Sequence, residues 1–325
     1  MTTTASRLET KPETRPAGQV SRPGRTRKAP RVFKPPKPRR VAPAGVRVIA
    51  TAITLFSLSL LGFSGYLAFG ARLHHDRAQL VAWANFRKDL ADATAPTSQT
   101  KPDNPKQLLD LGTPVALLEI PKLHLKEVVF EGTTASVLEM GPGHLRSTVL
   151  PGQAGVSEIM GRAALYGGPF GQLSTLEPGD AINVTTGRGV HNYKVIDVRL
   201  SGMPQPPPMA VGAGRLLLAT AYGGPIVPTD VLRVDADLTS PVQPTRPLVI
   251  AGSKVSPAEK PMAIDRRAWL WVIAWEWPLV IAVVLVSLAR VYWGRWQAWI
   301  IAVPIVSFLG FATADVAARL LPNLM

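Results

Sequence analysis

The chain has 325 residues, no cysteine and a formal charge of +14 at pH 7. Without cysteine it has no disulfide framework, no thiolate metal site and no thiol nucleophile. Thirteen Lys or Arg and only two Glu lie within residues 1–47, so +11 of the net charge belongs to this stretch. A basic excess confined to one tail beside an apolar segment favours a membrane partner over nucleic acid, which is the lesser alternative.

Residues 1–45 are rich in Pro, Arg, Lys and Thr and poor in aromatic and branched apolar residues. Such a composition buries too little apolar surface to offset the entropy of ordering, so we predict a disordered tail. The run APRVFKPPKPRR (29–40) leaves open a partner that recognises polyproline II helices.

Three apolar segments are long enough to cross a membrane. Residues 48–69 carry no charge and as a helix would extend about 33 Å, which matches a bilayer core. A cleaved signal peptide is the alternative, but the basic stretch before the segment is far longer than in signal peptides. Residues 269–289 and 298–318 are the other two spans, with Arg290 and Arg295 between them. The positive-inside rule then predicts a multi-pass protein of the cell membrane with a cytoplasmic N-terminus, although two spans rather than three remain open.

Between the first and second predicted spans, the pattern of apolar and polar residues changes twice. Residues 71–114 begin with apolar residues at helical spacing and continue as a polar stretch, which predicts a juxtamembrane helix and linker. Residues 115–240 hold short branched apolar runs such as VALLEI, AINVTT and VLRVDADL, separated by Gly, Pro and Asp. This pattern predicts an all-β barrel or sandwich. Residues 241–268 are predicted to form a second linker. Because the N-terminus is expected in the cytoplasm and the first span leads out of it, the β domain is expected to be extracellular.

Four runs of the β region stand in a characteristic order and spacing. They are LLEIPKLHLKEVVFEGTT from Leu117, GPGHL from Gly141 with LPGQAG from Leu150, LYGGPFGQLSTLEPGDAINV from Leu165, and LLLATAYGG from Leu216. Together they resemble the sortases, transpeptidases that attach proteins to the Gram-positive cell wall, and among them the actinobacterial class C or E type. The resemblance implies a closed eight-stranded β-barrel, here with transmembrane α-helices.

The positions that carry catalysis in the resembled family hold other residues in this chain. A sortase uses a thiolate to attack a carbonyl, an imidazolium to protonate the leaving amine and a guanidinium to hold the substrate or oxyanion. By the resemblance, Arg162 stands in place of the His, Ala221 in place of the Cys and Val231 in place of the Arg. We therefore predict no catalytic residues, no metal and no cofactor.

Four residues remain candidates for a groove that binds without cleaving: Arg162, Thr220, Arg233 and His144. The two arginines would keep such a cleft cationic. His144 lies in the GPGHL turn, where a hydrogen bond that stabilises the turn is the simpler interpretation. His191 follows a hairpin turn and is expected to be exposed to solvent.

The leading hypothesis is a membrane-anchored pseudo-transpeptidase that binds a sorting-signal peptide, a sortase or another cell-envelope protein. One alternative is an active transpeptidase or peptidase with relocated catalytic residues. Another is a membrane scaffold that acts through its basic tail. The sequence shows no acid/base pair or metal-ligand spacing that would replace the lost residues.

Overall fold

The structure is a computed structural model, in which residues 43–101, 103–224, 227–245, 255–292 and 295–325 are described. The predicted disordered tail lies outside the described residues except for positions 43–45. The chain divides into two units, residues 1–49 and 50–325, and the whole β domain belongs to the second.

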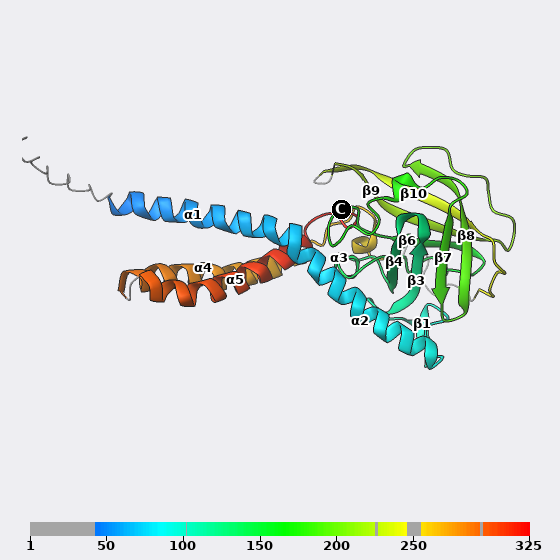
Figure 1. Cartoon of the computed structure of the whole chain (residues 1–325), viewed down its shortest axis with the longest axis horizontal. Coiled ribbons are helices and arrows are strands. Elements are labelled where there is room, and N and C mark those ends of the chain that lie inside the picture. Colours follow the sequence, from blue (N-terminus) through cyan, green and yellow to red (C-terminus); the bar gives the residue numbers. More distant parts are fainter. Residues whose placement is uncertain (1–42, 102, 225–226, 246–254, 293–294) are drawn as a thin grey trace, which may run out of the picture. The chain divides into compact units, whose positions relative to one another are not determined.

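Eight strands close into a barrel, which confirms the predicted all-β fold (Figure 1). The order around the barrel is β10-β8-β7-β3-β4-β5-β6-β9, with β4–β5 and β6–β9 parallel and the other pairs antiparallel. The strands are β3 (Pro114–Ile120), β4 (Leu125–Glu131), β5 (Gly143–His144), β6 (Gly155–Met160), β7 (Ala181–Thr186), β8 (Gly189–Leu200), β9 (Gly214–Gly223) and β10 (Pro228–Leu238).

Alternation along the strands separates the barrel interior from its outer face. Leu216 and Leu218 on β9, and Val234 and Ala236 on β10, are fully buried members of the interior core. Residues between these positions face outward, because successive side chains of a strand point to opposite sides of the sheet. The outer face of β9 and β10 therefore carries a second set of residues, and the candidate site lies there.

Helices precede the barrel. The helical stretch runs through α1 (Ala44–Gly65), the π-helical turn η1 (Tyr66–Gly70) and α2 (Ala71–Ala91). Phe86 of α2 is fully buried against the outside of β3 and β4. Strands β1 (Thr100–Lys101) and β2 (Asn104–Leu108) pair as a hairpin in the segment expected to be a linker. The remaining short helices are η2 (Pro121–Leu123), α3 (Ala135–Leu138), η3 (Leu173–Thr175) and η5 (Pro257–Glu259).

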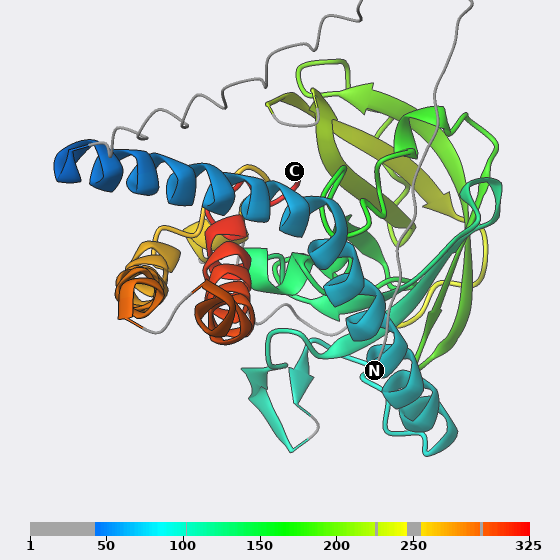
Figure 2. The ribbon, with the colours of Figure 1, turned by 60° about the vertical axis from the view of Figure 1, so that its left-hand side comes forward.

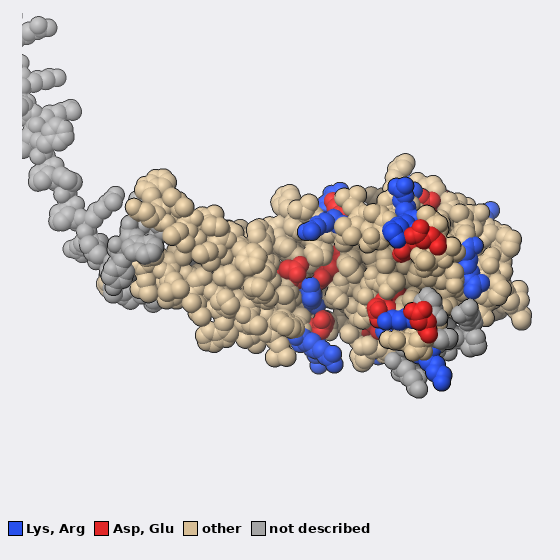
Figure 3. All heavy atoms as spheres, turned by 90° about the horizontal axis from the view of Figure 1, so that it is seen from below, with Lys and Arg blue, Asp and Glu red and all other residues tan. Residues whose placement is uncertain are grey.

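Two apolar helices follow the barrel, α4 (Ala268–Tyr292) and α5 (Arg295–Ala318), and they lie side by side (Figure 2). Within them, Ala268–Val286 and Ile300–Ala318 each have a mean hydropathy of 2.0, enough in length and composition to cross a membrane. On the face drawn in Figure 3, charged side chains gather over the barrel and its junction with the helices, while the described part of the helices is almost free of them. These features indicate membrane association.

Candidate functional site

The outer face of β9 and β10 holds two of the three positions at which the resembled family places catalytic residues. Ala221 on β9 lies opposite Val231 on β10 in the antiparallel ladder. Both side chains are buried, with 8% and 7% of their surface exposed. They belong to an apolar cluster whose other buried members are Leu138, Met160, Ala219 and Leu324.

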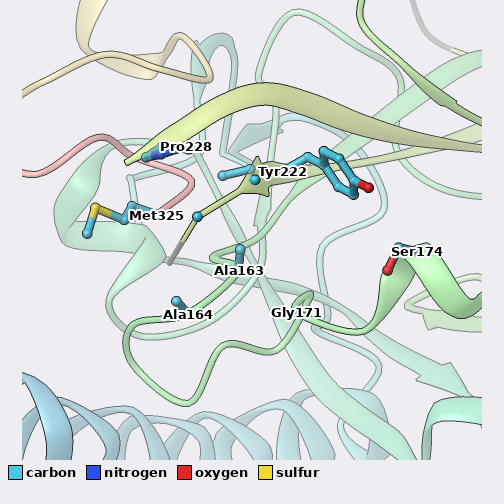
Figure 4. A pocket seen from close by; sticks show the side chains of 10 residues that line it. Ala163, Ala164, Gly171, Ser174, Tyr222, Pro228 and Met325 are labelled. Atoms are coloured by element: carbon cyan, nitrogen blue, oxygen red, sulfur yellow. The ribbon is translucent and has the colours of Figure 1, made fainter. Parts of the chain in front are cut away.

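A pocket of about 360 Å³ opens beside Ala221, at the end of β9. Its described lining comes from the loop after β6, from the end of β9 and the start of β10, and from the last residue of the sequence. Figure 4 shows Met325 and Pro228 on one side of it and Ser174 on the other. The lining residues are Ala163, Ala164, Gly171, Ser174, Ala221, Tyr222, Gly223, Gly224, Pro228 and Met325.

Arg162, at the expected His position, is completely buried beneath this pocket's loop. Its guanidinium lies 4.8 Å above the ring of Tyr166 and donates one hydrogen bond, from Nη2 to the Ala135 carbonyl at 3.3 Å. The Nε and Nη1 atoms have no hydrogen-bond partner among the described residues. Burial lowers the pKa of Arg162, while the nearby Glu139 carboxylate raises it. Such a side chain contributes to packing and offers no proton to a bound ligand.

Tyr166 has a backbone φ of +53°, a left-handed conformation that is rare for a large side chain. Its ring is buried between the Arg162 guanidinium and the imidazole of His74, which meets it edge-on at 6.0 Å. Stacking with a cation is worth about 1–2 kcal/mol at a desolvated site, which is comparable to the cost of the strained backbone. The Arg162–Tyr166 pair therefore fixes the path of the loop that borders the pocket.

A carboxylate at the end of α3 links this loop to α5. Glu139 is 1% exposed, and its Oε2 lies 3.3 Å from Nε of Arg319. Burial raises the pKa of Glu139 to about 7, although the guanidinium groups of Arg319 and Arg162 oppose this. Next to it, Tyr66 donates a hydrogen bond to Asp315, and Nη2 of Arg319 lies 3.4 Å from the same carboxylate. Charged groups thus join the end of α5 to the barrel.

The side chains of two candidate groove residues form hydrogen bonds within the barrel domain. Thr220 is 2% exposed, and its hydroxyl donates to the Gly161 carbonyl at 2.9 Å. His144 is fully buried, with Nδ1 2.9 Å from Glu131 and Nε2 2.9 Å from the Val149 carbonyl. Burial lowers the pKa of His144, but Glu131 and the Val149 carbonyl outweigh it and the net pKa is raised. Neither residue lines the pocket beside Ala221.

Arg233 lies on the same outer face as Val231, but two residues further along β10. It lines a different cleft of about 500 Å³, together with Arg199, Arg215 and two carboxylates, Glu158 and Asp235. Nη1 of Arg233 donates to the Ser201 hydroxyl at 3.0 Å. Burial raises the pKa of Glu158, which Arg233 partly offsets. The cleft is therefore of mixed charge, and the structure does not bring Arg233 beside Arg162.

The expectation that His191 is exposed to solvent is wrong. The side chain is 1% exposed, and its Nε2 lies 3.0 Å from the Thr186 hydroxyl. A Cβ placed on Gly152 would overlap its ring, so the turn after β5 packs directly on the hairpin. The imidazole is covered by a segment distant in sequence, which the local pattern of the hairpin turn does not reveal. Burial lowers the pKa of His191.

The residues around Ala221 offer hydroxyl groups but no base. Ser174 and Tyr222 are the hydroxyl-bearing residues of the described lining, which contains no His, Asp, Glu, Lys or Arg. A serine hydroxyl without a general base is a weak nucleophile. Nor do the described residues include a group of three His, Asp or Glu side chains arranged to hold a metal ion. The described lining therefore supplies no general acid or base.

Residues 322–325 are the part of the site that sequence reasoning missed. Leu324 is fully buried against Ala221 and Val231, and the Ala163 N–H donates to its carbonyl at 2.9 Å. In the sequence these residues are the run PNLM, which follows an apolar span with no pattern that distinguishes it from a helix end. Their position depends on where α5 returns to the barrel.

The family comparison matches a part of the chain that lies within the barrel domain. Residues 118–208 match the family model described as Sortase domain. A search of curated proteins finds no match.

Several solved structures are similar to the chain. One is a sortase D5 transpeptidase from Clostridium perfringens, with 21% identity, covering 50% of this chain and 99% of that chain at a TM-score of 0.40. Sortase C-1 from Actinomyces oris is 26% identical over 39% of this chain and 75% of its own, at a TM-score of 0.33. Sortase A from Corynebacterium diphtheriae is 18% identical over 58% and 95%, at a TM-score of 0.37.

Proposed function

We propose that this chain is an inactive member of the sortase family that binds the sorting-signal peptide of another cell-envelope protein at the membrane surface. The observation that carries the proposal is the site around Ala221. Where the family resemblance expects a thiol, an imidazole and a guanidinium, this chain has a methyl group, a completely buried arginine and a valine.

The chemistry of these side chains supports the absence of turnover. Covalent catalysis on a peptide carbonyl needs a nucleophile, and neither Ala221 nor Val231 has a reactive atom. The Arg162 guanidinium is held between Tyr166 and the Ala135 carbonyl, so it neither donates a proton nor reaches a ligand in the pocket. The neighbouring Thr220, the other hydroxyl that an active enzyme with relocated residues would call on, already donates its proton to the Gly161 carbonyl.

Binding is supported by a surface that combines a main-chain donor with apolar side chains. The Ala163 N–H, in the loop that borders the pocket, donates to the main-chain carbonyl of Leu324. Near it lie the apolar side chains of Ala221 and Val231 and the pocket that Met325 borders. Main-chain hydrogen bonds together with pockets for side chains are a common mode of peptide recognition. The apolar helices α4 and α5 would hold this surface close to a membrane.

The proposal is tested with the full chain solubilised in detergent. We expect immobilised LPXTG-type peptides to retain it, whereas scrambled peptides of equal composition and an unrelated membrane-anchored barrel give only background. In parallel, a quenched sorting peptide incubated with a diamino nucleophile should show no turnover. Clear turnover that disappears in Thr220→Ala or His144→Ala would favour an active enzyme instead, and retention no better than that of the control barrel would contradict binding.

A further inference from the structure

The outer face of β9 and β10 is occupied by the chain's own residues Pro322–Met325. Leu324 has no exposed surface, and its side chain packs in the apolar cluster with Ala221 and Val231. Its carbonyl accepts the hydrogen bond of the Ala163 N–H at 2.9 Å. This segment therefore satisfies the main-chain donor and packs with the apolar side chains on which the proposed peptide binding rests.

Asn323 holds the segment in place. It is 1% exposed, and its Nδ2 donates towards three main-chain carbonyls, those of Thr133 at 3.2 Å, Ala258 at 2.7 Å and Lys260 at 3.0 Å. Its own N–H donates to the carbonyl of Ala263 at 3.0 Å. One side chain thus ties together the barrel, the approach to α4 and the residues after α5. A segment bound by these contacts is a specific ligand of the barrel.

Only two residues separate the segment from the charged contacts that fix the end of α5. Arg319 lies 3.3 Å from the buried carboxylate of Glu139 and 3.4 Å from Asp315. Met325, at the other end, is 5% exposed and packs in a cluster with Leu165 and Tyr166 while it borders the pocket. The segment therefore forms a short turn, in which the Met325 N–H donates to the Pro322 carbonyl at 3.1 Å, and its last residue borders the pocket (Figure 4).

We propose that Pro322–Met325 is a built-in occupant of the peptide groove, which a sorting-signal peptide must displace before it binds. The inference rests on the proposed function and names the regulation of that same site. An attached occupant acts at an effective concentration on the order of millimolar, so it weakens the apparent affinity for any competing peptide without abolishing binding. Movement of α5 against the barrel would then change access to the groove.

The absence of cysteine from the sequence allows a direct test. In the full chain in detergent, Ala221→Cys gives a single thiol beneath Leu324, whose reaction with a maleimide reports access to the groove. We expect labelling to be about tenfold faster or more when residues 322–325 are removed or when Leu324→Ala is added, because exposure controls thiol reactivity. Val190→Cys, on an exposed hairpin, is a matched control that should label equally fast with or without the segment. Leu80→Ala, at an exposed leucine of α2, should leave the labelling of Ala221→Cys unchanged.

Peptide competition completes the test. An LPXTG-type peptide should slow the labelling of the shortened chain at concentrations about tenfold below those required with the segment present. Equal labelling rates with and without the segment would overturn the inference, and so would equal protection of both chains by peptide. If peptide protects neither chain while their labelling rates still differ, the segment covers the groove but peptide binding is overturned, so the two failures are told apart. Thermal melting of each variant shows whether faster labelling reflects loss of the fold.

Discussion

Ala221 and Val231 face each other across the β9–β10 ladder, and both belong to the buried apolar cluster that contains Leu324. In sortases the corresponding positions are expected to hold the nucleophile and the guanidinium. Here the three side chains belong to one apolar cluster, in which Leu324 is fully buried. Under the proposed function, the positions expected to carry catalytic groups instead belong to the surface that the chain's own segment covers.

The buried carboxylate of Glu139 makes stability depend on pH. Its pKa is raised from 4.5 to about 7 by burial, so between these values the folded protein keeps a proton that the unfolded chain has released. The contribution of Glu139 to the free energy of unfolding should therefore fall as pH rises from 4.5 to 7 and then level off. In Glu139→Gln, which stays neutral, this loss should be smaller by about 3 kcal/mol between pH 4.5 and 8.

Denaturant unfolding of both proteins across that pH range measures the difference. His144, whose pKa is also raised, remains in both chains and cancels in the comparison. Parallel pH profiles for Glu139→Gln and the unchanged chain would contradict the buried, protonated carboxylate.

Arg162 should tolerate an apolar replacement of similar size better than a truncation. Its guanidinium is fully buried, and two of its nitrogen atoms have no hydrogen-bond partner in the described part of the chain, so charge burial costs nearly as much as its contacts contribute. We expect Arg162→Met to change the free energy of unfolding by less than about 1.5 kcal/mol, while Arg162→Ala loses about 3 kcal/mol because a cavity remains. Thermal and chemical unfolding of the two variants measures these changes. A larger loss of unfolding free energy in Arg162→Met than in Arg162→Ala would show that the charge itself is required.

His144 is expected to act through structure, by its contacts to Glu131 and the Val149 carbonyl. Removing the imidazole leaves a buried carboxylate without its partner, so His144→Ala should lose about 3 kcal/mol of unfolding free energy. The exposed His124 provides the control, since His124→Ala should change stability by no more than about 0.5 kcal/mol. An equal, small effect of both substitutions would contradict the importance of the buried pair.

Alanine substitutions at two glycines with left-handed backbones distinguish the cost of steric crowding from the cost of backbone strain. Gly152 has φ +88° and a Cβ there would overlap the His191 ring, whereas Gly189 has φ +117° with nothing within 4 Å. Gly189→Ala should cost only the backbone strain of about 1–2 kcal/mol. Gly152→Ala should cost at least about 2 kcal/mol more, because the imidazole must move out of the interior. Similar melting temperatures of the two variants would mean that the turn is not packed as described.

Membrane topology is accessible through single cysteines introduced into this cysteine-free chain. With the barrel outside, Val190→Cys on an exposed β hairpin should react with a membrane-impermeant maleimide in intact cells. A cysteine in the basic tail, such as Thr3→Cys, should react only after the cells are permeabilised, because the excess of Lys and Arg favours the cytoplasmic side. The reverse labelling pattern would overturn the proposed orientation.

Local patterns in the amino-acid sequence are enough to predict the strands, because alternation and turn residues act over a few positions. The runs AINVTT and VLRVDADL lie within β7 and β10, and both strands place buried residues on the interior side as a barrel wall requires. The lack of any thiol likewise follows from composition alone. These properties are local or additive, so they need no knowledge of how distant segments meet.

The surroundings of the site depend on contacts between distant parts of the chain, which no local pattern predicts. Leu324 meets Ala221 from 103 positions away in the sequence, and Arg319 meets Glu139 across 180. Burial of His191 under the turn at Gly152 is of the same kind. Such contacts arise when closure of the barrel and return of α5 bring separate surfaces together, and the free energy that selects them comes from packing rather than from any periodicity along the chain.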